Sequence, residues 1–258
     1  MKKQPYYFAY ENRYKTVYES GAERWGHSPD DKELYDTLKE WVHDYCLKGK
    51  TIIEFACGEG ASGAILSKLG CFYHGVDLSP SAVMKAKETL KSYPNARVDI
   101  LDMVKETTGE TYDAALDCMG LHMLVTDEDR KSYLKNALLS LKEGSPMLFY
   151  KESYHSANDG ETVVTSPVPS YEDWLKMTGA DYETPSVRKL DLGDSHLEIM
   201  LPFVPTRAND REGYMAEMNL AGFKVEKFIE MNRSKAILSS ASIYVRKPCR
   251  RNSEMVLN

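Results

Sequence analysis

Three acidic residues stand where hydrophobic segments of the chain end. Glu54 lies four residues before Gly58 in IIEFACGEG, Asp77 ends the second such segment in GVDLS, and Asp102 lies in DILDM. If these segments are parallel strands, their carboxyl ends meet at one edge of a sheet. Carboxylates at that edge can pair with an amino group, with both hydroxyls of a ribose and with the exocyclic amine of an adenine. We therefore expect a ligand that has an ammonium group and an adenosine.

The glycines of the same stretch leave two ligand classes open. Gly58, Gly60 and Gly63 form G-x-G-x-x-G, the spacing typical of dinucleotide sites. Glycines at a strand-to-helix turn let a ligand approach the backbone, and the following helix offers free N–H groups. Glu54 would repel a pyrophosphate but can pair with a cationic amino group. The acids therefore favour S-adenosylmethionine over a nicotinamide dinucleotide, and Gly63 falls in place by coincidence.

The hydrophobic pattern predicts the elements that position these residues. Short apolar segments alternate with segments of helical spacing from residue 51 onwards, which indicates a parallel sheet with helices on both faces. The predicted strands are 51–56, 71–79, 96–103, 112–120, 145–153, 223–231 and 240–248, and the short connection between the last two suggests an antiparallel pair. The predicted helices of this part are 58–70, 81–93, 127–142 and 211–223.

Two further segments flank this alternation. Tyr7, Tyr10, Tyr14 and Tyr18 recur at helical spacing, and a second helix is expected over roughly 30–48. Residues 154–208 hold five of the eleven Pro residues and interrupt the alternation after the fifth strand. We predict an N-terminal helical cap (1–50), a core (51–153 and 209–247), an insertion over the acceptor site (154–208) and a tail (248–258).

The motifs together resemble those of class I S-adenosylmethionine-dependent methyltransferases. IIEFACGEG, GVDLS, DILDM and YDAALDCMGLHML follow the order and spacing of that family over about residues 51–152. One departure is Ala56, where the family usually has its first glycine. The resemblance implies an α/β, Rossmann-like three-layer sandwich. Its seven-stranded, mostly parallel sheet would have an antiparallel last strand, with an N-terminal helical cap and an insertion after strand five.

The resemblance also implies which residues hold the cofactor, S-adenosyl-L-methionine, and its product S-adenosyl-L-homocysteine. The methionine end would contact Glu54, Ala56, Cys57, Gly58 and Gly60. Asp77 and Leu78 would flank the ribose and adenine, Asp102 and Met103 would lie against the adenine, and Cys118 and Met119 would line the floor under the sulfonium. In similar enzymes an N-terminal helix lies over the cofactor, and here Arg13, Tyr14, Tyr18 and Trp25 fit such a lid or a plain packing role.

The candidate catalytic residues follow the fourth and fifth predicted strands. A sulfonium is an activated methyl donor, so a general base is needed only when the acceptor must lose a proton. His122 is the best candidate by position, and the sequence equally allows it to line the pocket or to cap the next helix. Tyr154 and His155 could also reach the methyl group, whereas Lys151 and Glu152 are expected to pair on the rim. Candidate acceptor contacts are Tyr18 and, in the insertion, Tyr171, Trp174, Tyr182 and Arg207.

Composition narrows the classes of function. The formal net charge is -6, which disfavours nucleic acid, and no apolar run approaches the roughly 18 residues that span a bilayer. The five cysteines never form C-x-x-C, so neither a metal site nor a disulfide framework is expected, and the chain is interpreted as cytoplasmic.

The leading prediction is methyl transfer to a small-molecule N or O acceptor by a monomer or homodimer. A peptide or protein acceptor is the main alternative. A nucleic-acid base methyltransferase would carry an Asn/Asp-Pro-Pro-aromatic motif where this chain has Asp117, Cys118, Met119 and Gly120. A non-catalytic binding protein and a nicotinamide oxidoreductase are further, weaker alternatives.

Overall fold

The computed structural model describes residues 4–155, 167–179, 186–191, 196–201, 204–231 and 239–249. The chain begins with a short 3-10 helix, η1 (Tyr6–Phe8), followed by α1 (Ala9–Glu19) and α2 (Lys32–Asp44). The second helix starts later than predicted because Asp31 is its N-cap and accepts a hydrogen bond from the backbone N–H of Leu34.

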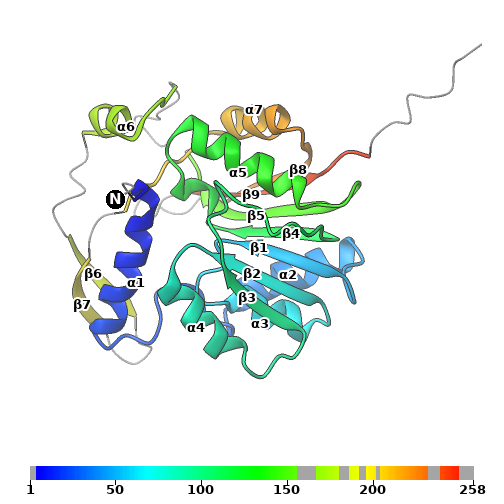
Figure 1. Ribbon diagram of the computed structural model, residues 1–258, viewed down its shortest axis with the longest axis horizontal. Helices are drawn as coiled ribbons and strands as arrows, with labels where there is room; N and C mark the ends of the chain where they lie inside the picture. Colours follow the sequence, from blue (N-terminus) through cyan, green and yellow to red (C-terminus); the bar gives the residue numbers. More distant parts are fainter. Residues whose placement is uncertain are drawn as a thin grey trace, which may run out of the picture.

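A seven-stranded sheet forms the centre of the molecule. In chain order its strands are β1 (Thr51–Phe55), β2 (Phe72–Asp77), β3 (Ala96–Ile100), β4 (Ala114–Cys118), β5 (Pro146–Ser153), β8 (Lys224–Met231) and β9 (Ser240–Arg246). The spatial order is β3-β2-β1-β4-β5-β9-β8. All neighbours pair in parallel except β9, which is antiparallel to both β5 and β8. The predicted fold is confirmed (Figure 1).

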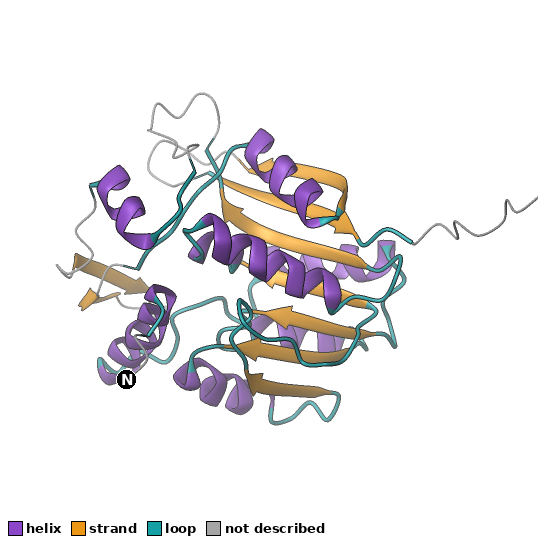
Figure 2. Ribbon diagram, turned by 45° about the horizontal axis from the view of Figure 1, so that its top comes forward, coloured by secondary structure: helices purple, strands orange, loops and turns teal. Residues whose placement is uncertain are grey.

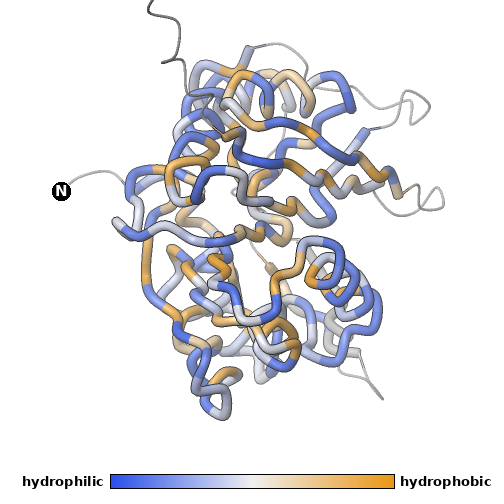
Figure 3. The backbone as a smooth tube through the Cα atoms, turned by 90° about the vertical axis from the view of Figure 1, so that its right-hand side faces the viewer, coloured by the Kyte–Doolittle hydropathy of each residue, from blue (hydrophilic) through white to orange (hydrophobic). Residues whose placement is uncertain are grey.

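Helices cover both faces of the sheet because alternate strand residues point to opposite sides. The α2 helix, α3 (Ala61–Lys68) and α4 (Pro80–Leu90) enclose one buried cluster, which includes Ile52 and Leu148. The other cluster, with Ile53 and Phe149, lies under α5 (Asp127–Leu139) and α7 (Arg211–Ala221). Figure 3 shows the matching sequence pattern, in which short hydrophobic segments interleave with hydrophilic ones along the chain.

The segment between β5 and α7 adds elements outside the sheet. It contains α6 (Tyr171–Thr178) and a two-stranded hairpin of β6 (Ser186–Asp191) and β7 (His196–Leu201). Leu201 of β7 packs with Val17 and Ala22 at the end of α1. The hairpin therefore lies beside α1, as Figure 2 shows, and the cap and the insertion meet on one side of the molecule.

The strand order reverses between β1 and β4, which are neighbours in the sheet although β2 and β3 lie between them in the chain. In open α/β sheets the crevice outside the carboxyl ends of the strands at such a switch point is where ligands bind. The residues after β1 and β4 are thus the first place to look for a site.

Candidate functional site

Backbone strain marks the carboxyl ends of three adjacent strands. Ala56 follows β1 with φ of 50°, Met119 follows β4 with φ of 67°, and Lys151 lies near the end of β5 with φ of 55°. Residues with side chains seldom adopt this left-handed conformation, which costs roughly 1–3 kcal/mol and clusters at functional sites. Three such residues at one edge indicate that the chain is shaped there for a ligand.

The turn after β1 explains the one departure from the family pattern. Ala56 takes the left-handed conformation for which a glycine is usual, so the alanine keeps the turn at the cost of some strain. Gly58 also has a positive φ, of 51°, and a Cβ atom there would lie 2.9 Å from the hydroxyl of Tyr14. The helix α1 therefore sits directly over the glycine turn. Gly60 is the N-cap of α3, with φ of 79°.

A cavity of about 790 Å³ opens above this turn. The predicted residues that line it are Tyr14, Trp25, Glu54, Ala56, Cys57, Gly58, Cys118 and Met119. Glu54 is 1% exposed and accepts a hydrogen bond from the Tyr73 hydroxyl. Burial raises the pKa of its carboxyl to about 8. A buried acid of this kind is suited to a cationic group, which would favour its ionised form.

A smaller cavity adjoins the first. Asp77, Leu78, Asp102 and Met103 line it, and Tyr14, Ala56 and Met123 line both cavities. Asp77 accepts hydrogen bonds of 2.8 Å from the backbone N–H groups of Gly58 and Ser79, and burial raises its pKa to about 6. The structure therefore brings the three predicted acids to two neighbouring cavities at one edge of the sheet.

Asp102 also has partners within the protein. It accepts hydrogen bonds from the hydroxyl of Tyr7 at 3.1 and 3.2 Å and from the backbone of Val104 at 3.1 Å, and it pairs with Lys105 at 2.8 Å. Asp102 thus caps the turn after β3 and joins it to η1.

The part of the chain that holds these cavities matches a known family of domains. Residues 53–147 match the family described as "Methyltransferase domain". No curated protein sequence matches the chain.

Solved structures show the same fold over nearly the whole chain. A S-adenosylmethionine-dependent methyltransferase from Clostridium acetobutylicum ATCC 824 is 14% identical, with a TM-score of 0.62 over 94% of this chain and 99% of that one. Burkholderia thailandensis 1,6-didemethyltoxoflavin-N1-methyltransferase is 13% identical (TM-score 0.61; 95% and 93%). Magnesium protoporphyrin IX methyltransferase from Synechocystis PCC 6803 is 12% identical, with a TM-score of 0.62 over 96% of this chain and 99% of that one.

The enzyme holds its N-terminal segment against the glycine turn through Glu59, a residue that sequence reasoning missed. The carboxylate is 3% exposed and accepts hydrogen bonds from the Tyr18 hydroxyl at 2.8 Å, the Trp25 backbone at 2.9 and 3.1 Å, and the Gly26 backbone at 2.7 Å. Nothing in GEG signals this role, because it depends on a segment more than thirty residues away. The name "lid" is used below for residues 14–28.

The arginine that was predicted to lie over the cofactor lies differently, and a histidine of the lid was missed. The Arg13 guanidinium lies 4.7 Å above the Trp25 ring and is buried, and Arg13 does not line either cavity. His27, which the sequence analysis did not name, does line the larger cavity, with its Nδ1 atom 2.7 Å from Asp31. Among the described lining residues of that cavity, His27 is the one side chain that can carry a positive charge.

The pairing expected for Lys151 and Glu152 is wrong. Lys151 instead pairs with Glu33 of α2 at 2.7 Å, and Glu152 is fully buried beside His122. The physical reason is a bulge in β5 between Phe149 and Glu152, which includes the left-handed Lys151 and changes the side to which the following side chains point. A bulge cannot be deduced from the alternation of residue types.

Packing determines where the other two candidate catalytic residues, Tyr154 and His155, lie. Tyr154 is 5% exposed, and its ring meets Phe228 edge-on. Burial, followed by its hydrogen bond with Glu230, raises its pKa to about 12. His155 donates its backbone N–H to the carbonyl of Asn209. The structure therefore directs Tyr154 towards β8 and away from the two cavities.

The insertion candidates pack against the core. Trp174 is buried with Val125 and Val168, and Tyr171 stacks on Tyr6 at 4.6 Å between ring centres. Arg207 is buried and pairs with Asp127 at 2.6 Å. Tyr182 lies outside the described residues.

The described part of the chain contains neither a cluster of metal ligands nor a helix that could span a membrane. No group of three or more His, Cys, Asp and Glu residues there could hold a metal ion. None of the helices described is long and apolar enough to cross a membrane.

Proposed function

We propose that the enzyme transfers the methyl group of S-adenosylmethionine to a nitrogen or oxygen atom of a small molecule. The observation that supports this acceptor class is the lid. Tyr14, Trp25 and Gly26 line the larger cavity, and Glu59 binds the backbone of two of them. A cavity that the lid covers in part suits a small acceptor, whereas a protein or a nucleic acid would need an open groove.

The similar structures favour the same class. By their titles, one is a 1,6-didemethyltoxoflavin-N1-methyltransferase bound to 1,6-didemethyltoxoflavin, and another is a magnesium protoporphyrin IX methyltransferase. Both titles name small molecules. The net charge of -6 and the absence of Lys and Arg among the described lining residues of the larger cavity argue against a nucleic acid.

The cavity residues fit the cofactor by their chemistry. Glu54 is a buried acid whose raised pKa would fall beside an ammonium group, so it is proposed to hold the methionine end. Asp77 is proposed to accept from the ribose hydroxyls. Asp102 and Met103 are proposed to face the adenine, while Cys118 and Met119 would surround the sulfur. When bound there, the cofactor supplies a methyl group already activated by the sulfonium.

The protein's own contribution is then position and the exclusion of water. Tyr14 and Met123 border both cavities, so they lie where the two halves of the site join. Cys118 and Met119 offer apolar, polarisable surface at the end of β4. With the lid bound to Glu59, an acceptor beside these residues would be oriented in a site shielded from solvent.

Calorimetry and labelling test the proposal. We expect S-adenosylmethionine to bind and NAD to give no heat. We then expect tritiated methyl groups to enter the low-molecular-mass fraction of a cell extract. Absence of heat with S-adenosylmethionine would refute the cofactor assignment, and label confined to the macromolecular fraction would refute the small-molecule acceptor while leaving the cofactor assignment intact.

A further inference from the structure

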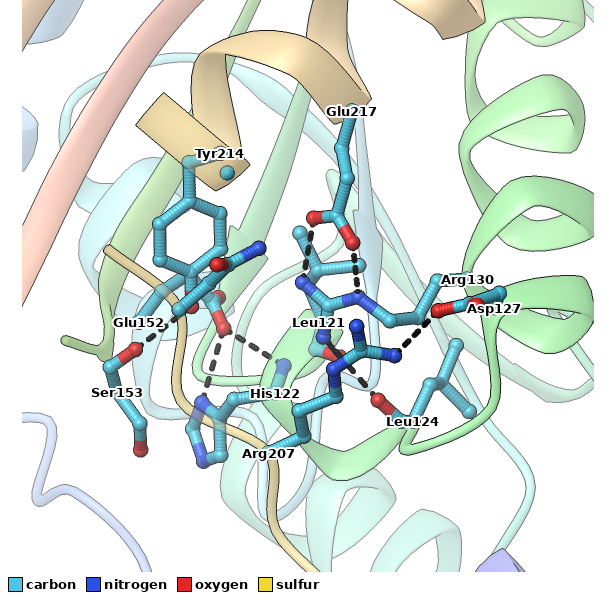
Figure 4. A network of polar contacts seen from close by, with 12 residues as sticks. Leu121, His122, Leu124, Asp127, Arg130, Glu152, Ser153, Arg207, Tyr214 and Glu217 are labelled. Atoms are coloured by element: carbon cyan, nitrogen blue, oxygen red, sulfur yellow. Dashed lines mark hydrogen bonds and ion pairs between the residues drawn. The ribbon is translucent and has the colours of Figure 1, made fainter. Parts of the chain in front are cut away.

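A buried polar network surrounds the turn that follows β4, and Figure 4 shows it from close by. The turn contains the 3-10 helix η2 (Leu121–Met123), with His122 at its centre. The carboxylate oxygen Oε2 of Glu152 accepts a hydrogen bond of 2.9 Å from the backbone N–H of His122, and it lies 2.9 Å from Nδ1 of the same residue. One oxygen thus fixes both the backbone and the ring of His122.

Two buried arginines hold the same turn from the other side. Arg130 donates to the carbonyls of Leu121 at 3.0 Å and Leu124 at 3.1 Å. Arg207 donates its side chain to the carbonyl of Val125 at 3.0 Å and its backbone N–H to the carbonyl of His122 at 2.8 Å. Four carbonyls of the turn are therefore held, which fixes the position from which the His122 side chain projects.

The charges of these arginines are balanced by acids outside the turn. Arg130 forms a bidentate pair with Glu217 of α7, with both distances 2.7 Å, and Arg207 pairs with Asp127 at 2.6 Å. Glu152 consequently remains the partner of His122. The frame serves to position the turn, and it draws on α5, α7 and the chain leading into α7.

The strained backbone of β5 also helps to position His122. The left-handed Lys151 and the bulge between Phe149 and Glu152 direct the Glu152 side chain into the protein, where it is 0% exposed. Its second oxygen, Oε1, is buried without a hydrogen-bonding partner in the described residues. A strained backbone and a buried carboxylate are both costly. Glu152 also interacts with Asp117, Arg130 and the backbone of Leu121, but it holds both the backbone and the ring of His122, which points to a functional role for that histidine.

The free ring nitrogen of His122 supports this interpretation. Within the described residues Nε2 has no hydrogen-bonding partner, and it is not among the sealed polar atoms, so it keeps access to solvent. Burial lowers the pKa of the imidazole to about 4, so the ring is neutral at physiological pH. The charged groups next to it are Glu152, Asp117 and Arg130, of which Asp117 raises that pKa and Arg130 lowers it.

The turn also lies beside the proposed cofactor site. Met119 and Met123, which flank His122 in the chain, line the larger cavity, and Met123 lines the smaller one too. His122 is therefore within one turn of the place where the cavities join. His122 itself is not a lining residue of either cavity, and it adjoins the lining residue Met123, so an acceptor held next to Met119 and Met123 would have to approach its Nε2 atom.

We propose that His122 is the general base of the methyl transfer and that Glu152 is its positioning residue. The inference rests on the proposed function, and it names a class of acceptor. That acceptor carries a proton on its nucleophilic atom, as an alcohol, a phenol or an ammonium does. The acceptor's proton passes to Nε2, its heteroatom forms a bond to the methyl carbon, and the electron pair of the broken carbon–sulfur bond stays on sulfur. Glu152 stabilises the imidazolium that results, and solvent later removes the proton.

The proton position on the ring tests the geometry without any acceptor. We expect ¹⁵N NMR of the protein bound to S-adenosylhomocysteine to show His122 with the proton on Nδ1 and a lone pair on Nε2, the signal being assigned by its loss in His122→Asn. A proton on Nε2 would overturn the proposal, because that nitrogen could not then accept one. This result stands whether or not an acceptor has been found.

Transfer measurements test the role. His122→Asn keeps a donor towards Glu152 and lacks Nε2, so labelling of the low-molecular-mass extract fraction should fall by about 100-fold or more, with unchanged affinity for S-adenosylhomocysteine. Glu152→Gln should lower the labelling rate at saturating cofactor while the melting temperature and that affinity stay near wild type. His43→Asn, at an exposed histidine of α2, is the matched control and should change nothing. Wild-type labelling by His122→Asn would overturn the proposal, whereas a wild type that fails to bind S-adenosylhomocysteine would instead refute the proposed function.

Discussion

At the residue scale, the carboxylate of the proposed cofactor needs a positive partner in a cavity that four acidic side chains line. Asp30, Asp31, Glu54 and Glu59 all line the larger cavity, and His27 is the single lining side chain among the described residues that can balance them. Its Nδ1 atom is engaged with Asp31, which leaves Nε2 to face a ligand. Sequence reasoning instead named Arg13, whose guanidinium lies over the Trp25 ring.

His27→Ala should therefore lower the affinity for S-adenosylhomocysteine by about tenfold, which corresponds to about 1.4 kcal/mol of binding free energy. It should leave the affinity for methylthioadenosine unchanged, because that compound lacks the amino-acid head group. Calorimetry with both compounds gives the comparison, and His43→Ala is the control. An equal loss with both compounds would show a general disturbance of the lid and would contradict the assignment.

Asp77 permits a second test at this scale. Its carboxylate holds the backbone N–H groups of Gly58 and Ser79, and it is also placed to bind a ribose. Asp77→Ala should reduce the affinity for S-adenosylhomocysteine by about 100-fold, since two backbone donors and two ribose hydroxyls lose their acceptor at once. The exposed Asp44→Ala on α2 is the control. If Asp77→Ala retains affinity, the ribose lies elsewhere.

Single residues also show where sequence reasoning stopped. Glu54, Asp77 and Asp102 were identifiable because each ends a predicted strand, and topology alone brings strand ends together. Glu59 and Glu152 were not identifiable as structural partners. Their roles depend on burial and on contacts with Trp25 and His122, and neither burial nor contact is encoded in local residue spacing.

At the element scale, Glu59 and Glu11 attach the N-terminal segment to the core. Glu11 of α1 is buried and accepts hydrogen bonds from Ser79 and from both the backbone and the hydroxyl of Ser81, at the start of α4. Glu59, just before α3, accepts hydrogen bonds from the lid and so attaches the lid to the core. Movement of the lid away from the larger cavity would break the contacts of Glu59, whereas those of Glu11 can stay in place.

Glu59→Gln should loosen the lid, because an amide can present its NH₂ group to the backbone donors of Trp25 and Gly26. We expect hydrogen–deuterium exchange at these two amides to become about tenfold faster or more, and S-adenosylhomocysteine to dissociate faster. Exchange in the β strands should not change. Glu19→Gln, which removes an exposed charge at the end of α1, is the control. Unchanged exchange in Glu59→Gln would exclude this residue as the latch.

The elements differ in how well the sequence predicted them. Apolar alternation placed all seven strands of the sheet, and tyrosine spacing placed α1, because both patterns follow from which side of an element is buried. The β5 bulge, the Tyr6–Tyr171 stack and the hairpin against α1 were not predicted. Each is a contact between segments distant in the chain, and no local period reports it.

At the scale of the whole molecule, buried acids couple stability to pH. Burial raises the pKa of Glu54 to about 8 and that of Glu152 to about 7. In the unfolded chain these carboxyls have the ordinary pKa of 4.5. Between that pH and the raised pKa of each carboxyl, the folded state holds more protons than the unfolded chain. The free energy of unfolding must therefore fall as pH rises through this range. The buried histidines His74 and His122 have lowered pKa values, so their opposing effect is complete by about pH 6.5, near the ordinary value for histidine.

The melting temperature of the ligand-free enzyme should therefore fall between pH 6.5 and pH 8.0. A difference of about 1 kcal/mol corresponds to roughly 2–4 °C for a chain of this size, so the fall should be several degrees. S-Adenosylmethionine should raise the melting temperature more at pH 8.0 than at pH 6.5, because its ammonium group favours the ionised Glu54.

Glu54→Gln separates this explanation from a general effect of alkaline pH. The amide cannot ionise, so the variant should lose much of the pH dependence in the absence of ligand and should bind S-adenosylmethionine weakly at both pH values. Glu40→Gln, at an exposed position of α2, should keep the wild-type slope. If Glu54→Gln retains the full slope, the pH dependence resides in the other buried acids with raised pKa values, Glu152 and Asp117, and Glu152→Gln and Asp117→Asn should then each reduce it.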